Sequence, residues 1–401
     1  MTTALVIGAG IAGPVAAMAL QKAGIHAKVF EGHPTGADEL GSWLTLQANG
    51  IDALAAVDAQ HVVRGVGFPQ PSMRFLSGSG RVLGRMSNGA PLADGTPTQM
   101  MPRAGLYAAL RDEAVARGAS IAYGRRFVDA TPTGTRVTAR FADGSTAEGD
   151  LLVGCDGIRS RVRQVIDPAA PPVRYVPVLN IGGFIPGMTV PGAPVGEFQM
   201  VFGKRCFWAY VVTPDGGLGW FANPPRADEP TAAELAAMTD EDWRTWLLAL
   251  TASDRGPFAE IVRAAPGPLA GWATYDMPTV PTWHRGTMIV IGDAAHATSP
   301  AAGQGAAMAL EDAVLIARFL RDAPDVPTAF RLFEQMRRER VEKIVKHGAR
   351  SSNSKAAGPV GRILRDALLP LGLRMAQKQN TDWIHAHHVE WETPAVSRPA
   401  A

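Results

Sequence analysis

The chain has 401 residues, 46% hydrophobic and 19% charged, which is typical of a folded protein of two or three domains or one discontinuous assembly, and not of a disordered or fibrous chain. Its 39 basic and 37 acidic residues give a formal net charge of +2, so no strong field attracts nucleic acid or an anionic membrane, and the expected partner is a small molecule. Cys155 and Cys206 lack the spacing of a metal site or a disulfide framework. The N-terminus lacks a basic signal-peptide region, and no apolar run reaches the roughly 20 residues that span a bilayer. We therefore expect a soluble cytoplasmic protein.

The first 31 residues have the order of a β-α-β unit. An apolar run from Thr2 to Ile7 predicts a strand, Gly8 to Gly13 a tight turn, and Ile11 to Ala23 a helix closed by Gly24. His26 to Glu31 predicts a second strand. This order is typical of a parallel sheet with helices on its faces.

Two hairpins are expected further along. The sequence MRFLSGSGRVLGRM, between Ser72 and Ala90, predicts one that interrupts the first fold before a helix at 104–117. Arg136 to Phe141 and Thr146 to Val153 flank Asp143-Gly144, which is a strong turn signal, and lead to GCDGIRSRVR.

The second half changes character. Proline, glycine and aromatic residues are dense from Pro171 to Trp283, which predicts a mostly β region, with a strand such as Cys206 to Thr213 and a helical insert near Thr231 to Leu250. Further predicted elements are a strand at Thr287 to Ile291, helices at about Gly305 to Asp322 and Pro327 to His347, and a partly helical tail that is loose after Thr393.

Gly8, Gly10 and Gly13 match the pattern G-x-G-x-x-G between a strand and a helix, and Glu31 ends the next strand 18 residues later. Glycine permits the tight turn and lets the backbone approach a pyrophosphate, whose charge the helix N-terminus stabilises. Glu31 is placed to accept a hydrogen bond from an adenosine ribose hydroxyl. The motif alone does not distinguish FAD from NAD.

A second motif, IGDAAHATSPAAGQGAAMALEDA, follows the strand at Thr287 to Ile291. Asp293, at the strand end, can bind polyol hydroxyls, and the Gly303-Gln304-Gly305 turn exposes backbone N–H groups at a helix N-terminus. Reduced flavin carries negative charge near N1 and O2, so this helix end suits a flavin. For His296 we favour local packing and hydrogen bonding over a role as catalytic base.

The three motifs together resemble the class A FAD-dependent monooxygenases, which include para-hydroxybenzoate and salicylate hydroxylases, kynurenine monooxygenase and tetracycline-modifying enzymes. They are the G-x-G-x-x-G turn at Gly8, the DG motif Asp156-Gly157-Ile158-Arg159-Ser160 with Arg163, and the GD motif Gly292-Asp293 followed by Pro300. Their order along the chain matches that family.

The resemblance implies a set of FAD-binding residues: Gly8, Gly10, Ile11, Ala12, Gly13, Glu31, Arg103, Asp156, Gly292, Asp293, Pro300, Gly303, Gln304, Gly305, Ala306 and Ala307. Arg103, in PRAGLYAAL, would reach the ribityl-pyrophosphate chain, Asp293 would bind the ribityl chain, and 300–307 would border the isoalloxazine. Asp156 and Arg159 would meet NAD(P)H as it passes. Many relatives have asparagine where this chain has Ala307, so only backbone amides could act there.

The substrate side is less specified by the sequence. Trp208, Tyr210, Trp220 and Phe221 could form an aromatic wall over a flat substrate, or could be sheet core. The sequence identifies no catalytic side chain, and the backbone at Pro300 is the one candidate in the flavin loop.

The expected fold is α/β, with a Rossmann-like FAD-binding domain, an inserted mostly β substrate domain and C-terminal helices. The FAD domain would comprise 1–70, 98–170 and 284–350, the β-sheet domain 71–97 and 171–283, and the C-terminal segment 351–401. A monomer or a homodimer is expected.

The resemblance implies that NAD(P)H reduces FAD, dioxygen forms a C4a-hydroperoxide, and one oxygen atom hydroxylates or epoxidises a small aromatic substrate. Alternatives are an FAD-dependent oxidase, a Baeyer–Villiger enzyme or a halogenase on the same scaffold, although the halogenase motif WxWxIP is absent. A flavin protein that sequesters an intermediate without oxygenating it is a further alternative.

Overall fold

A six-stranded sheet forms the centre of the computed structural model, which describes residues 1–35, 43–353, 359–378 and 382–396. Its order is β18-β19-β12-β1-β2-β8. The bounds are β1 Thr3–Ile7, β2 His26–Phe30, β8 Ser120–Ala122, β12 Leu151–Gly154, β18 His284–Arg285 and β19 Met288–Val290. All neighbours run parallel except β18 and β19, which confirms the predicted parallel sheet. β12 is buried along its whole length, because helices cover the sheet.

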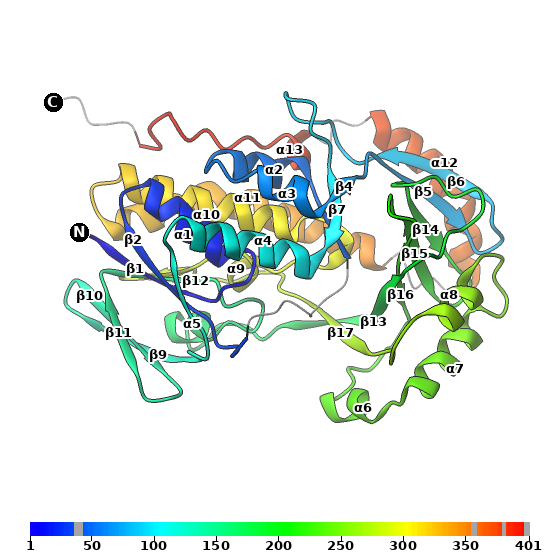
Figure 1. The fold of residues 1–401 in the computed structure, drawn as a ribbon, viewed down its shortest axis with the longest axis horizontal. Coiled ribbons are helices and arrows are strands. Elements are labelled where there is room, and N and C mark those ends of the chain that lie inside the picture. Colours follow the sequence, from blue (N-terminus) through cyan, green and yellow to red (C-terminus); the bar gives the residue numbers. More distant parts are fainter. Residues whose placement is uncertain (36–42, 354–358, 379–381, 397–401) are drawn as a thin grey trace.

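Helices pack around this sheet on the left of Figure 1. They are α1 Ala12–Lys22, α2 Ala48–Ala55, α3 His61–Val66, α4 Arg103–Ala116, α5 Arg161–Ile166, α9 Asp293–His296, the 3-10 turn η1 Pro300–Ala302, α10 Gly305–Asp322 and α11 Val326–Asn353. α10 contacts α1, α2 and α11 and is buried from Ala307 to Phe319. Its bounds are those predicted, whereas α11 extends beyond the predicted end at His347.

The prediction of one strand from Thr146 to Val153 is wrong. β11 (Thr146–Gly149) pairs with β10 (Arg136–Phe141), which also pairs with β9 (Phe127–Thr133), whereas β12 joins the parallel sheet. The chain turns at Asp150, whose carboxylate accepts from the Thr3 N–H at 2.7 Å. A Cβ on Gly149 would lie 2.8 Å from Leu5 Cγ, so the crossing needs glycine there.

A seven-stranded sheet, on the right of Figure 1, has the order β17-β13-β16-β15-β14-β5-β6. The bounds are β5 Ser72–Ser77, β6 Val82–Ser87, β13 Arg174–Ile185, β14 Phe198–Phe202, β15 Phe207–Val212, β16 Leu218–Asn223 and β17 Gly271–Asp276. The hairpin predicted between Ser72 and Ala90 is confirmed, and β5 pairs in parallel with β14. Segments that are 125 positions apart, such as Met73 and Phe198, therefore pair in one sheet.

The helical insert contains more helices than predicted. It contains α6 (Ala232–Ala237), α7 (Asp240–Thr251) and α8 (Phe258–Ala264). Capping boxes at Thr231 and Thr239 begin α6 and α7, and the second one separates the two helices. A small sheet was also not predicted: β3 (Trp43–Leu46) and β4 (Phe68–Pro69) both pair with β7 (Gln99–Pro102). This sheet lies beside the seven-stranded one, because Trp43 packs on Phe184.

The C-terminal part contains α12 (Pro359–Lys378) and α13 (Asp382–His385) and then returns to α10. Arg318 donates to the Thr393 carbonyl at 3.0 Å and Ala395 N–H donates to Asp322 at 2.6 Å, so the chain is held for longer than predicted, and 397–401 lie outside the described residues. Within the described ranges, no helix has the length and apolar character to cross a membrane. The division into domains at the proposed boundaries stays a prediction.

Candidate functional site

The glycine turn after β1 leaves open space at one position. A Cβ on Gly8 (φ +101°) would lie 2.5 Å from the Cys155 carbonyl oxygen, and one on Gly13 would lie 1.9 Å from the Gly8 carbonyl oxygen. Gly10 has no atom within 4 Å of its Cβ position. The outer glycines are therefore required by the chain itself, whereas the backbone at Gly10 is accessible to a ligand. Ile11, which precedes α1, provides no side-chain cap for the helix N-terminus at Ala12.

Glu31 lies directly beside this turn. Its carboxylate accepts from the Ala9 N–H at 2.7 Å and from the His33 N–H at 2.8 Å. Because β1 and β2 are parallel neighbours, the carboxyl ends of the two strands bring the acid and the glycines together. Each oxygen keeps a second lone pair for a hydroxyl donor.

Arg103, at the start of α4, is held by Tyr107. Its Nε donates to the Tyr107 hydroxyl at 2.7 Å, and its guanidinium lies 5.2 Å from the centre of that ring. Burial raises the pKa of Tyr107 against the opposing effect of Arg103, and the negative charges of Asp293 and Glu31 add to the rise. Arg103 is therefore oriented by Tyr107 through both a hydrogen bond and a cation–π contact. The sequence reasoning missed Tyr107, although its i,i+4 spacing from Arg103 was a usable signal.

The GD motif places Asp293 opposite the start of α10. Gly292 has φ +59°, and a Cβ there would lie 3.1 Å from Ala309 Cβ. The Asp293 carboxylate lies 3.8 Å from the Cβ position of Gly305. α10 has no side-chain cap at Gln304, so the N–H groups of its first turn, at Gly305, Ala306 and Ala307, lack intrahelical acceptors.

The rest of the predicted flavin loop lies next to these residues. Pro300 begins η1 and is exposed, and Gly303 ends it with φ +62°. Gln304 is buried, so its side chain is not presented to a cofactor. Ala307 packs on α2, because a Cβ placed on Gly50 would lie 2.9 Å from the Cβ of Ala307. This close approach leaves little room for the asparagine found in many relatives.

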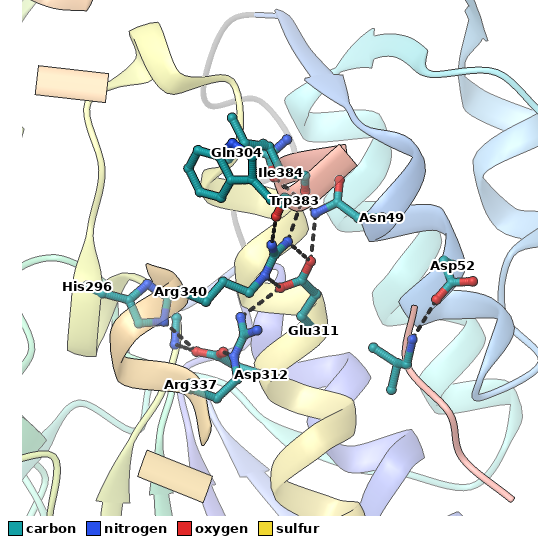
Figure 2. Close-up of polar contacts among 12 residues, drawn as sticks. Asn49, Asp52, His296, Gln304, Glu311, Asp312, Arg337, Arg340, Trp383 and Ile384 are labelled. Atoms are coloured by element: carbon teal, nitrogen blue, oxygen red, sulfur yellow. Dashed lines mark hydrogen bonds and ion pairs between the residues drawn. The ribbon is translucent and has the colours of Figure 1, made fainter. Parts of the chain in front are cut away.

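A buried ionic cluster lies behind the GD motif and the loop (Figure 2). Asp312 accepts from the Gly292 N–H at 2.9 Å, from His296 Nε2 at 2.5 Å and from Arg337 Nε at 2.7 Å. Burial alone would raise the pKa of Asp312, but His296 and Arg337 lower it to about 2. Asp312 therefore stays ionised and fixes Gly292 beside Asp293. The hydrogen bond that the sequence predicted for His296 is confirmed.

Glu311 continues the cluster toward α2 and α11. It accepts from Asn49 Nδ2 at 2.7 Å and from Arg340 at 2.8 Å, and Arg337 lies 2.8 Å away. Both carboxylates are fully buried and matched by two guanidinium groups, so the charges balance. The sequence reasoning did not identify Glu311, Asp312 or the arginines that pair with them.

The DG motif shapes its own loop. Asp156 accepts from Ser160 Oγ at 2.5 Å and from the N–H groups of Arg161 and Val162 at 2.7 and 3.0 Å. Arg163 donates to the Ala294 carbonyl at 2.8 Å, which joins this loop to α9. Arg159 is exposed, and its guanidinium lies 5.1 Å from the centre of the Tyr275 ring. Of the two residues predicted for NAD(P)H, Arg159 is thus the one that is accessible.

The sequence left two roles open for the aromatic residues of β15 and β16, and the structure favours the sheet core for three of them. Trp208, Tyr210 and Trp220 are buried on the face of the sheet that α7 and α8 cover, in one cluster with Trp243 and Phe258. Trp208 lies 5.0 Å from Phe258 between ring centres. These residues are core, because successive strand residues point to opposite faces and the three share the covered one.

Phe221 is the exception, since it points to the opposite face, toward the parallel-sheet part of the molecule. Trp43 and Phe68 pack against the same cluster. Trp43 lies 5.8 Å from Phe68 and 5.6 Å from Phe184, and Gly219 makes room for its ring, because a Cβ there would lie 3.2 Å away. An aromatic group therefore lies where the small sheet meets the seven-stranded sheet.

Together these features fit a dinucleotide whose other end is a flavin: an accessible glycine turn, an acid at the end of β2, and a second acid facing an uncapped helix N-terminus. The fold and site define a flavoprotein in which a parallel α/β sheet is joined to a large, mostly antiparallel sheet.

Comparisons with known proteins agree with this class. The chain belongs to the FAD binding domain family, whose profile matches residues 1–347. It is 30% identical over 352 residues to an FAD-dependent urate hydroxylase of Klebsiella oxytoca, covering 85% of this chain and 87% of that protein. It is 29% identical over 366 residues to an aurachin C monooxygenase/isomerase of Stigmatella aurantiaca, covering 86% and 87%.

A solved structure is similar over almost the whole chain. HpxO of Klebsiella pneumoniae, in complex with FAD and uric acid, superposes with a TM-score of 0.83 at 25% identity, covering 94% of this chain and 95% of that one. The predicted α/β fold and the FAD cofactor are confirmed, and the chain is an FAD-dependent oxidoreductase of the monooxygenase type.

Proposed function

We propose that the chain couples oxidation of NAD(P)H to transfer of one atom of dioxygen onto a small, flat aromatic molecule, with the other oxygen atom leaving as water. The observation that carries the proposal is the combination of Glu31, which accepts from the Ala9 N–H beside the open backbone of Gly10, with Asp293, which faces the start of α10. This arrangement addresses both halves of FAD at once, which a simple NAD site does not need.

The residues have distinct roles in this proposal. The backbone from Gly10 to Gly13 and the N-terminus of α1 would hold the pyrophosphate, and Glu31 would accept from the adenosine ribose. Asp293 would accept from the ribityl hydroxyls, with Arg103 on the connecting chain. The first-turn N–H groups of α10 would stabilise negative charge on the flavin. Bound FAD supplies the electron transfer between NAD(P)H and dioxygen.

Asp156 acts indirectly in this proposal. Its carboxylate already accepts three hydrogen bonds within its own loop, so it would shape the surface that Arg159 presents to NAD(P)H. The Arg159 guanidinium, held over the Tyr275 ring, carries the charge that would attract the pyrophosphate of a passing nucleotide.

For the substrate we infer a flat ring that packs on the face bordered by Trp43, Phe68, Phe184 and Phe221. An aromatic border excludes water, which limits unproductive loss of oxidising equivalents as hydrogen peroxide. The urate hydroxylase and the complex with uric acid support a flat substrate. We also propose the domain boundaries given by the sequence, with the seven-stranded sheet as the substrate domain.

The test has two stages. Flavin released by denaturing the purified protein should be FAD, and recovery of FMN alone would contradict the site. Aromatic compounds are then screened for stimulated NAD(P)H oxidation, with mass detection of products that gain one oxygen atom. A protein that only sequesters a flavin intermediate should show no substrate-dependent NAD(P)H consumption, and an oxidase should yield products without added oxygen.

A further inference from the structure

We propose that the C-terminal segment 383–389 is a positioning element of the flavin site, and that His385 and Asn49 orient the Gln304 turn at the start of α10. The proposal rests on the proposed FAD site. It assigns a role to the part of the chain that lies furthest from the glycine motif in sequence, and Figure 2 shows this part beside α10.

Gln304 is fixed through its side chain. It is 1% exposed, its Oε1 accepts from Asn49 Nδ2 at 3.0 Å, and its Nε2 lies 3.3 Å from His385 Nδ1. Because Gln304 precedes the first residue of α10, these two contacts determine how the turn presents the backbone N–H groups that follow. One partner comes from α2 and the other from the C-terminal segment.

The C-terminal segment is itself firmly anchored on both sides of His385. On one side, Arg340 donates to the carbonyl oxygens of Trp383 and Ile384 while it pairs with buried Glu311, and Lys343 lies 4.0 Å from the centre of the Trp383 ring. On the other side, the Val389 N–H donates to Asp52 of α2 at 2.8 Å.

The position of His385 therefore follows from backbone contacts with α11 and α2. Its imidazole transfers that position to Gln304, since Nδ1 can accept the amide proton. The glycine turn and Glu31, which would hold the adenosine diphosphate half, are separate from this turn and would retain FAD without it. The expected effect of losing His385 is a change in the electrostatic environment of bound flavin with little change in its affinity.

The experiment compares His385→Ala, His385→Asn and His388→Ala. Asparagine keeps an acceptor near the place of Nδ1, so it should restore what alanine loses. His388 is the matched control, because it lies in the same segment and makes an exposed ion pair with Asp52, which contributes little, while the Val389 contact remains.

Three quantities are measured: the FAD dissociation constant of the apoprotein, the visible spectrum of the holoenzyme and its flavin midpoint potential. His385→Ala should lower the two-electron equilibrium constant for flavin reduction about fivefold, the effect of one hydrogen bond, which corresponds to about 20 mV. FAD affinity should change less than about twofold. His385→Asn and His388→Ala should match the unmodified protein.

Several results would overturn the proposal. These are an unchanged potential and spectrum in His385→Ala, an equal shift in His388→Ala, or no restoration in His385→Asn. Asn49→Ala, which removes the other partner of Gln304, should shift the potential in the same direction, and no shift also contradicts the proposal. Failure of the unmodified protein to bind FAD would instead refute the proposed function, so the two failures are distinguishable.

Discussion

Replacing Gly10 with valine should remove FAD while the fold is retained. A Cβ at this position meets no atom of the chain within 4 Å, and Gly10 does not have the left-handed φ of Gly8. The added side chain would therefore extend into the space from which the backbone meets the pyrophosphate. The stability of the apoprotein should change little, with a Tm within about 2 °C of the unmodified protein.

The size of the effect follows from the hydrogen bonds that are lost. The turn precedes α1, whose N-terminus has no side-chain cap, so its N–H groups are free to bind an anion. Losing two hydrogen bonds to a charged group removes about 3–6 kcal/mol, at about 1.5–3 kcal/mol each. The FAD dissociation constant should rise by about two to four orders of magnitude.

The assay is titration of apoprotein with FAD, followed by flavin fluorescence, together with thermal unfolding. Gly65→Val is the control, because Gly65 also has an open Cβ position and lies in α3, away from the glycine turn. Gly13→Ala should differ from both, since its Cβ would lie 1.9 Å from the Gly8 carbonyl oxygen and should destabilise the apoprotein itself. A folded Gly10→Val protein with the affinity of Gly65→Val would refute the reasoning.

Three other predictions concern different parts of the site. Asp293→Ala should raise the FAD dissociation constant about tenfold or more, because a charged acceptor is lost. His296→Ala loaded with FAD should lose stability but keep its turnover within an order of magnitude. A collapse of turnover in a folded, FAD-loaded His296→Ala protein would instead make His296 catalytic. Arg159→Glu should slow flavin reduction by NAD(P)H in stopped-flow absorbance and leave the reaction of photoreduced enzyme with dioxygen unchanged; normal reduction would exclude Arg159 from the nucleotide site. Burial lowers the pKa of His387 to about 4, although the charge of Glu311 opposes this shift. Between pH 6.5 and 4 the unfolded chain therefore binds a proton at His387 that the folded protein does not. The free energy of unfolding should fall as the pH drops through this range. His387→Gln should flatten this part of the urea-unfolding profile, and an unchanged slope would exclude His387 as its source.

The parts of the fold that follow from local signals could be predicted from the sequence. Gly8 to Gly13 and Glu31 encode backbone geometry within about 25 residues, and the α10 bounds follow from an uninterrupted apolar periodicity. The break at Asp150 was missed although Gly149 and Asp150 are both residue types that strands disfavour, because the alternating pattern on its two sides was interpreted as one strand. Its cause is a long-range choice of partner, β10 before the break and β1 after it.

The small sheet of β3, β4 and β7 escaped prediction for a related reason. Its strands have two to four residues and are separated by helices and by the excursion into β5 and β6, so each is too short to show a period. The ionic cluster of Glu311 and Asp312 also could not be predicted, because its arginines come from another helix and have no fixed spacing in the sequence from the two acids. Adjacent acids in a buried helix were nevertheless a usable signal, because buried charges require partners.

The burial of Trp208, Tyr210 and Trp220 indicates the side of the seven-stranded sheet on which we expect the substrate pocket. In β15 and β16 aromatic residues occur on both faces, so composition cannot choose between them, and the choice is made by α7 and α8, which cover one face only. The FAD half of the site depends on backbone turns, which leave local motifs, whereas we expect the substrate half to depend on which strand face packs against the small sheet of β3, β4 and β7. Specificity should therefore respond to changes at Phe221, Phe184 and Trp43, and changes at Trp208 or Trp220 should act through stability.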